Sequence, residues 1–286
     1  EDLQIIGDGD VRIICRSQSP VMRLLVERLL VKNLQLHQEA EEDPDSESIA
    51  CVIVESGGGT VDGCTITGTA GGILITRSSE PLFLHCQIRE CRDFGIKIWA
   101  TSKPRIQQCQ LVDLKGFGIV AYGRNEGQVS HCDLSGMTHA AIVCGGRSLT
   151  EFDHNVIHDC HQGGFWVQEE SECTILNNEV HNTRLAAFQI GGHADPNVSG
   201  NIARDSQGGG IVVHENAKGT YTRNEVKGNR LAGVGVTDDA DPTFNGNVIC
   251  DGQSGGVVLH GRCFGVFERN RIVNNARANV GLKGTA

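Results

Sequence analysis

A group of acidic residues in the C-terminal third of the sequence has the composition of an acid–base site. Asp238, Asp239 and Asp241 fall in one predicted loop, and His214 and His260 flank them in the sequence. Glycoside hydrolysis uses two carboxyl groups a few ångströms apart, whereas polysaccharide lyases and epimerases use a base with a cation or an arginine. If the chain is an enzyme, we expect Asp238, Asp239, Asp241 and His214 to be its catalytic residues. The alternative is that these aspartates only solvate a turn.

Aromatic and polar side chains at equivalent positions of a repeated strand suggest ligand binding. Both tryptophans and one of the two tyrosines of the chain belong to this set. Aromatic side chains exposed on a flat sheet suit a peptide or a sugar ring. The predicted binding residues are Trp99, Tyr122, Trp166, Gln168, Gln189, His214 and His260. The alternative is that a loop or a terminal segment covers this face.

Histidines recur in pairs one repeat apart, as His131 with His154 and His158 with His181. A zinc site needs three or four ligands that converge on one point. Because equivalent positions of a repeat form a row, we expect these histidines to be stacked or solvated. The sequence predicts no metal and no cofactor.

The elements that position these residues follow a period of 23 residues. A fixed period in this range is typical of a solenoid. The clearest row consists of Asn155, Asn178, Asn201, Asn224, Asn247 and Asn270, and Cys132, Cys109 and Cys86 continue it upstream. Cys64 lies one residue out of step, 22 before Cys86. A second row has small residues throughout: Gly72, Gly95, Gly118, Ala141, Gly164, Ala187, Gly210, Gly233 and Gly256.

Apolar residues alternate with variable ones after each small residue, as in the segment from Gly210 to Val213. This period of two is typical of a strand with one buried face. Three such strands fit into each repeat, which leaves no room for hairpins, and the recurrent glycines and β-branched residues exclude helices. We therefore predict an all-β fold: a right-handed, single-stranded parallel β-helix of about ten coils, with the hand given by the crossover rule.

Composition excludes some functions. The net charge of −10 argues against a nucleic-acid partner, and no apolar run is long enough to span a membrane. Four of the twelve cysteines occupy the inward row, and the rest are scattered. We therefore expect reduced, buried thiols and a cytoplasmic or nuclear location rather than a disulfide framework.

The chain divides into residues 1–58, with irregular first coils or a cap, and residues 59–286, with the regular repeat. Within the first part, the segment from Val21 to Leu36 is compatible with strands or with an amphipathic capping helix, and strands are favoured. Residues 39–48 are acidic and predict a solvated loop. The sequence has no initiator methionine and no visible C-terminal cap, so we expect a piece of a longer chain.

Three segments carry a resemblance to a known family: Gly209 to Asn216, Arg223 to Val226, and Leu231 to Val236. They resemble the repeats of the CASH domain, the pectin-lyase-like parallel β-helix repeats found in F-box-only ubiquitin-ligase proteins. Asp195-Pro196 and Asp241-Pro242, two repeats apart, are similar to loops of that group. The resemblance implies a substrate-binding region. Related β-helices also occur in polysaccharide epimerases, lyases and hydrolases, although the chain has no Asp-Pro-His-Asp motif of the alginate epimerase type.

The sequence therefore predicts a non-catalytic recognition scaffold that binds a protein segment, and by resemblance the substrate-binding region of an F-box-type ligase or a cytosolic relative. Its anchors would be Trp99, Tyr122 and Trp166. The first alternative is a carbohydrate-active enzyme, whose acidic substrate would need a local basic groove to offset the charge of the chain. The second alternative is a structural solenoid within a larger assembly.

Overall fold

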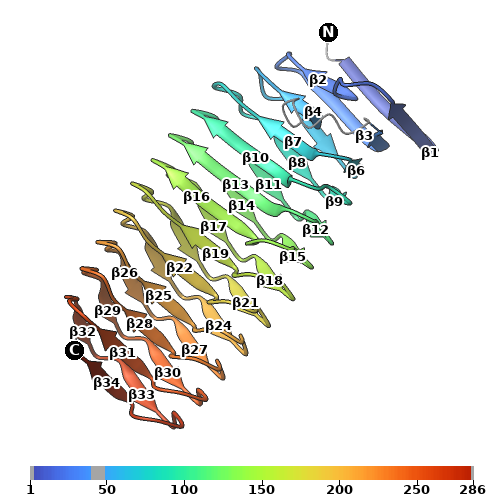
Figure 1. The fold of residues 1–286 in the computed structure, drawn as a ribbon. Coiled ribbons are helices and arrows are strands. Elements are labelled where there is room, and N and C mark those ends of the chain that lie inside the picture. Colours follow the sequence, from blue (N-terminus) through green and yellow to red (C-terminus); the bar gives the residue numbers. More distant parts are fainter. Residues whose placement is uncertain (1–2, 40–48, 285–286) are drawn as a thin grey trace.

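The computed structural model describes residues 3–39 and 49–284. These residues form 34 β-strands and no helix, and hence no helix that could cross a membrane. The chain winds along one axis, with its first strands at one end of an elongated body and its last strands at the other (Figure 1). The all-β solenoid expected from the 23-residue period is confirmed.

The strands belong to two sheets, in which neighbouring strands are parallel. Sheet B takes one strand from each coil: β2 (Met22–Leu24), β4 (Ala50–Val54), β7 (Gly71–Ile75), β10 (Phe94–Ala100), β13 (Phe117–Gly123), β16 (Ile142–Gly146), β19 (Phe165–Val167), β22 (Phe188–Ile190), β25 (Ile211–Val213), β28 (Val234–Val236), β31 (Val257–His260) and β34 (Val280–Lys283).

Sheet A takes one long strand from each of the first two coils, β1 and β3, and two strands from each later coil. Its members are β1 (Leu3–Cys15), β3 (Leu29–Gln38), β5 (Thr60–Asp62), β6 (Thr65–Gly68), β8 (Leu82–Leu84), β9 (Gln87–Arg89), β11 (Arg105–Gln107), β12 (Gln110–Val112), β14 (Gln128–Ser130), β15 (Asp133–Ser135), β17 (Glu151–Asp153), β18 (Val156–His158), β20 (Thr174–Leu176), β21 (Glu179–His181), β23 (Asn197–Ser199), β24 (Ile202–Arg204), β26 (Thr220–Thr222), β27 (Glu225–Lys227), β29 (Thr243–Asn245), β30 (Val248–Cys250), β32 (Val266–Glu268) and β33 (Arg271–Val273).

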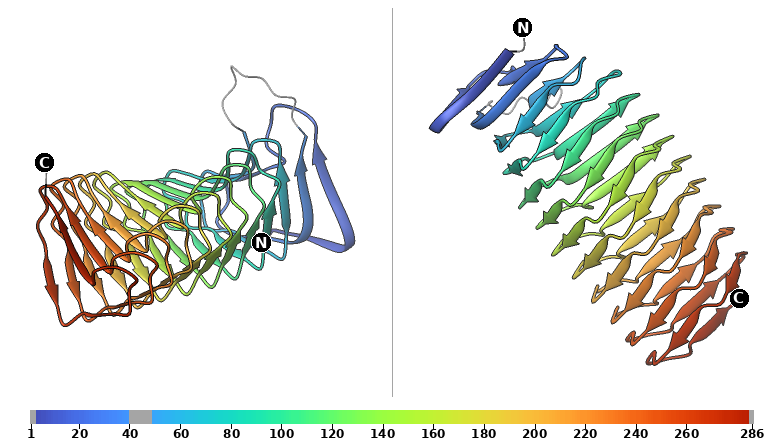
Figure 2. Two further views of the ribbon diagram at one scale, coloured as in Figure 1. Left: turned by 60° about the horizontal axis from the view of Figure 1, so that its bottom comes forward. Right: turned by 180° about the vertical axis from the view of Figure 1, so that it is seen from behind.

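Register follows the sequence period. Ile73 pairs with Ile96, Ile96 with Ile119, and Ile119 with Ile142, each step being 23 residues. Equivalent positions of successive coils therefore stack at the spacing of neighbouring strands, roughly 4.8 Å. The coils lie one above another along the whole body (Figure 2).

A thin core fills the inside of the coils. In β19 and β22, Phe165 and Phe188 point inward and their rings stack at 5.2 Å, while the residues between the inward positions face out. Tyr221 and Phe244 make a second stack, with ring centroids 4.4 Å apart. Stacked equivalent side chains give each coil the same cross-section, which keeps the register uniform.

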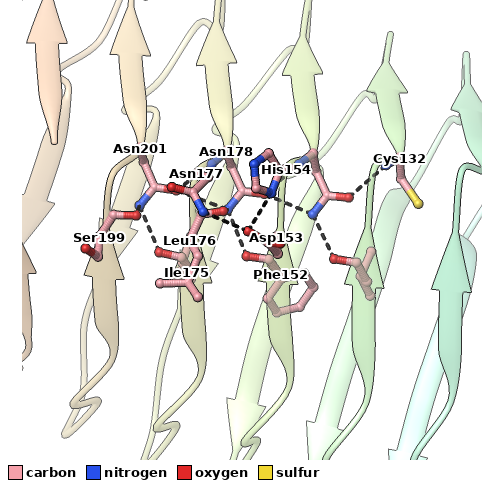
Figure 3. Close-up of polar contacts among 12 residues, drawn as sticks. Cys132, Phe152, Asp153, His154, Ile175, Leu176, Asn177, Asn178, Ser199 and Asn201 are labelled. Carbon is pink, nitrogen blue, oxygen red and sulfur yellow. Dashed lines mark hydrogen bonds and ion pairs between the residues drawn. The ribbon is translucent and has the colours of Figure 1, made fainter. Parts of the chain in front are cut away.

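The asparagine row is a continuous hydrogen-bonded spine (Figure 3). Oδ1 of Asn201 accepts hydrogen bonds from the backbone N–H and from Nδ2 of Asn178, at 2.8 and 3.0 Å. Nδ2 of Asn178 also donates to the carbonyl of Phe152 at 3.0 Å. Asn155 repeats this pattern one coil earlier, and Cys132 donates its N–H to Asn155. The spine satisfies polar groups that are otherwise buried at a tight corner.

Cysteines replace asparagine where the row continues toward the N-terminus. Cys64, Cys86, Cys109 and Cys132 are buried, and Cys132 directs its thiol toward the carbonyl of Ile106. All twelve cysteines of the chain are free thiols. The expected inward thiol row is therefore present, and a disulfide framework is not.

The first coils are irregular in length. Met22 pairs with Val52 and Val52 with Ile73, steps of 30 (52 − 22) and 21 (73 − 52) residues. The segment from Val21 to Leu36 forms β2 and most of β3, so the capping-helix alternative is wrong: its apolar residues complete coils of the solenoid. Of the expected acidic loop, residues 40–48 lie outside the described residues; Glu39 pairs with Arg16.

Candidate functional site

The outer face of sheet B holds most of the predicted binding residues. Alternation along each strand turns every second residue outward, and these residues form two rows along the axis. The outer row is Lys97, Val120, Val143, Trp166, Gln189, Val212, Gly235 and Val258. The flanking row, two residues further on in each coil, is Trp99, Tyr122, Gly145, Gln168, Gly191, His214, Thr237 and His260.

Trp99 and Tyr122 form a stacked aromatic pair at one end of this face. They are register partners on β10 and β13, their ring centroids are 5.0 Å apart, and the rings are inclined by 12°. Nζ of Lys97 lies 4.6 Å from the Trp99 ring and 5.8 Å from the Phe94 ring, a cation–π arrangement. Trp99 is 40% exposed, so part of the pair is open to solvent.

The side chain of Tyr122 is hydrogen-bonded to a carboxylate two coils away. Its hydroxyl donates a hydrogen bond of 2.8 Å to Oε1 of Glu169, and this bond raises the pKa of Tyr122. The other oxygen of Glu169 accepts the backbone N–H of Gly146 at 2.7 Å. Tyr122 therefore lies along the sheet axis, across the intervening coil.

Gly145 makes this position of Tyr122 possible. A Cβ at Gly145 would lie 2.8 Å from the Tyr122 ring and 3.5 Å from Nε2 of Gln168. The side chains of Tyr122 and Gln168 thus approach each other over a position that has no side chain. The two predicted residues are neighbours in the structure.

Gly191 has the same role for His214. A Cβ at Gly191 would lie 2.6 Å from Cε1 of His214. The imidazole lies over this glycine, with Nε2 3.3 Å from Nε2 of Gln189 and Nδ1 3.7 Å from Oε1 of Glu215. His214 and Gln189 therefore form a polar pair next to the outer row.

Trp166 and His260 are the remaining predicted binding residues. Trp166 lies in the outer row, half-buried, between Val143 and Gln189. His260 is exposed at the end of β31, two coils beyond His214. The face thus brings together Trp99 with Tyr122 and Gln168, and Gln189 with His214, whereas His260 stands apart from these pairs.

Beyond β10, this face becomes apolar and ends in an open pocket. Ile53 and Phe94 are largely buried there and pack with Leu74 and Val120. The pocket has a volume of about 370 Å³, and its lining includes Pro20, Arg23, Ile49, Ile53 and Leu74. Leu74 and Ile53 continue the outer row beyond Lys97, so a ligand that follows this row would reach the pocket.

The predicted catalytic aspartates do not contact His214. Asp239 pairs with Arg262, and Asp241 is exposed at the next turn. Asp238 and Asp239 have positive φ values of 54° and 62°, as expected of turn residues. Glu215, the acidic neighbour of His214, accepts the N–H of Gly192 at 3.1 Å. The carboxylates of Asp239 and Glu215 therefore have structural partners.

The paired histidines stack on the outside of sheet A. The rings of His131 and His154 are 5.2 Å apart, as are those of His158 and His181. Burial, followed by the charge of Arg204, lowers the pKa of His181. Within residues 3–39 and 49–284, no three His, Cys, Asp or Glu side chains gather in a way that could hold a metal ion.

Three residues of the site did not stand out in the sequence as binding residues. Gly145 and Gly191 alternate with large residues in the flanking row, and that alternation is the signal that could have found them. Glu169 lies in a loop with other acidic residues, and no sequence pattern singles it out. Its bond to Tyr122 joins positions 47 residues apart (169 − 122), one residue out of register, so the repeat alone does not pair them.

Comparison with known proteins agrees with this fold. The family described as "Right handed beta helix region" matches residues 45–148 and 140–285. No curated protein sequence matches the chain. Among solved structures, a mutant of the periplasmic alginate epimerase AlgG superimposes with a TM-score of 0.75 at 13% identity, covering 99% of this chain and 76% of that one.

Two further structures are similar over most of the chain. The catalytic unit of a GH87 α-1,3-glucanase from Streptomyces thermodiastaticus has a TM-score of 0.65 at 12% identity, covering 86% of this chain and 55% of that one. The A-module of the Azotobacter vinelandii mannuronan C-5 epimerase AlgE4 has a TM-score of 0.56 at 15% identity, covering 81% and 72%. At these identities the likeness is one of fold, and the expected right hand is confirmed by the family.

Proposed function

Because the chain belongs to the right-handed β-helix family, we propose that the outer face of sheet B binds a carbohydrate chain laid along the axis. The observation that carries the proposal is the stacked, half-exposed pair of Trp99 and Tyr122, fixed in place by Glu169. Pre-positioned rings lose little conformational entropy when a sugar stacks on them. The similar structures are named as enzymes of alginate and of α-1,3-glucan, which supports a carbohydrate ligand.

The same face has groups for acid–base chemistry on a bound sugar. The imidazole of His214 is half-buried beside the amide of Gln189, and it is the candidate base. Tyr122 keeps its proton to higher pH than an ordinary tyrosine, so it is a hydrogen-bond donor rather than a base. A lyase, epimerase or hydrolase activity would therefore depend on His214 more than on the aspartate group first predicted.

Binding is measured by calorimetry against fragments of alginate, polygalacturonate and α-1,3-glucan, with NMR of the sugar as the readout for turnover. Trp99→Ala and Tyr122→Ala should weaken binding at least about tenfold, and His214→Gln should abolish turnover while binding remains. Phe264→Ala is the matched control, because Phe264 is an exposed aromatic residue in the turn after β31, outside the outer row and the flanking row. Equal loss in this control, or no binding by the parent chain, would contradict the proposal.

A second candidate is recognition of a protein segment, as in the substrate-binding region of an F-box-type ubiquitin ligase or a cytosolic relative. The observation that favours it is the set of twelve free thiols, which suits a reducing compartment rather than the setting of a secreted enzyme. Under this proposal Trp99 and Trp166 would anchor a peptide, no sugar would be turned over, and a cytoplasmic or nuclear location would follow.

A further inference from the structure

A row that contains several cations lies along the edge of sheet B that precedes each of its strands. The row has one residue per coil, and none of them is acidic: Arg92, Lys115, Thr138, His161, Arg184, Gln207, Arg230 and Gln253. We name Lys115, His161, Arg184 and Arg230 the basic rim. All four side chains are exposed.

Backbone hydrogen bonds hold the basic rim in register. The N–H of Arg184 donates to the carbonyl of Cys160 at 3.1 Å, and that of Arg230 donates to Ser206 at 2.9 Å. Two coils separate the two arginines, roughly 9.6 Å at the normal strand spacing. Their spacing is therefore set by the fold and not by flexible loops.

The cations of the basic rim have no acidic partner within the described residues. Two of the nearby turn acids have other partners, Asp159 with His158 and Asp205 with Arg204. The opposite edge of sheet B carries more acids than bases: Glu169, Glu170, Glu172, Asp195, Glu215, Asp238, Asp239 and Asp241 lie there beside Arg124, Arg147, Lys218 and Arg262. An anionic partner would be attracted to one edge and repelled from the other.

Two exposed leucines belong to the same turns. Leu185 and Leu231 directly follow Arg184 and Arg230, and they are 50% and 57% exposed. Between them lies Gly208, where a Cβ would be only 2.3 Å from the backbone of Leu185. The position between the two exposed leucines therefore carries no side chain of its own, because the backbone of the preceding coil already fills that space.

We propose that the basic rim, with Leu185, Gly208 and Leu231, is a docking surface for an acidic protein segment. Carboxylates of the segment would pair with Arg184 and Arg230, and an apolar side chain would lie over Gly208 between the leucines. Charge complementarity selects the acidic partner, and the two exposed leucines favour a peptide over a hydroxyl-rich sugar. The site is separate from the aromatic pair and does not depend on carbohydrate binding there.

The test is selection of a random phage-displayed peptide library on the intact chain, followed by affinity measurements on synthetic versions of the enriched peptides. Enriched peptides should carry Asp or Glu around an apolar residue. Their affinity should fall about tenfold in the Arg184→Glu/Arg230→Glu variant, since two exposed ion pairs change sign. Leu185→Ser/Leu231→Ser should also weaken them.

Matched controls lie on other surfaces. Arg124→Glu/Lys218→Glu makes the same change in charge on the opposite edge of sheet B, and Leu149→Ser changes another exposed leucine. Thermal melts confirm that each variant folds. The proposal is overturned if no peptide is enriched, if the peptides lack excess acid, or if the controls weaken binding equally. Displacement of the peptides by polygalacturonate fragments that need the same arginines would assign the rim to a sugar instead.

Discussion

Tyr122 donates a hydrogen bond of 2.8 Å to Glu169, although 47 residues and two coils separate them in the chain. The bond spans a coil whose flanking residue is Gly145, so no side chain stands between the two groups. Because Glu169 also accepts the N–H of Gly146, its carboxylate is fixed at both oxygens. The relationship orients the aromatic pair on which the proposed ligand would stack.

Replacing Glu169 should change the titration of Tyr122. The carboxylate raises the pKa of Tyr122 by accepting a hydrogen bond from its protonated hydroxyl, so Glu169→Gln should move this pKa toward the ordinary value of about 10. In the parent chain the folded state keeps this proton to higher pH than the unfolded state. The contribution of Tyr122 to stability is therefore present below its ordinary pKa and lost as pH rises through the raised one. Ultraviolet titration in a Tyr221→Phe background measures it; an unchanged titration would contradict the hydrogen bond.

A methyl group at Gly191 should displace His214. The added Cβ would lie 2.6 Å from the imidazole, and the ring can move because it is the end of a side chain. Gly191→Ala should therefore shift the NMR signals of His214 and reduce ligand binding with little loss of stability. Gly235→Ala is the control, since its Cβ would meet only Val212, at 3.8 Å. Similar effects from both variants would exclude a specific role for Gly191.

Removing one asparagine from the spine should destabilise the chain. Asn201→Ala would leave the N–H and Nδ2 of Asn178 and the carbonyl of Ile175 without their partner, at a cost of about 2–4 kcal/mol. Asn201→Cys should cost less, because the chain itself uses cysteine in this row. Urea unfolding gives both values. Asn197→Ala, at an exposed position of β23, should change the free energy of unfolding by less than about 0.5 kcal/mol; an equal cost at both sites would refute the spine.

Thiol reactivity should distinguish Cys15 from the core cysteines. Hydrogen bonds from the Ser17 side chain and backbone lower the pKa of Cys15, whereas burial raises the pKa of Cys51 and Cys91 to about 12. At neutral pH Cys15 should be alkylated first, and the core thiols only after denaturant is added. Mass spectrometry of the labelled chain locates each adduct, and Cys15→Ser should remove the fast phase. Rapid labelling of Cys51 in the native chain would contradict the prediction, because it would show that the reagent reaches the interior of this coil.

The fold could be predicted in unusual detail because each coil solves the same packing problem. Asn178 and Asn201 belong to a row of asparagines with one constant spacing. When strands pair in register, a constant spacing places equivalent residues of successive coils in contact. The predictions were weakest in residues 1–58, where steps of 30 and 21 residues replace the regular period. There the sequence of the segment from Val21 to Leu36 was compatible with a helix or with strands. Only its pairing with later coils in the structure shows that it forms strands.

By itself, the sequence determined the parallel β-helix, the inward thiols, the asparagine spine and the face on which Trp99 and Tyr122 lie. These properties follow from period and alternation, which are local. Tertiary structure alone decided that Tyr122 is hydrogen-bonded to Glu169, that His214 lies over Gly191 away from the aspartates, and that Arg184 and Arg230 form no ion pair with an acid of the described residues. These relationships depend on the direction in which each side chain points between neighbouring coils. A long side chain can reach beyond its own row, and the repeat does not specify which residue it contacts there.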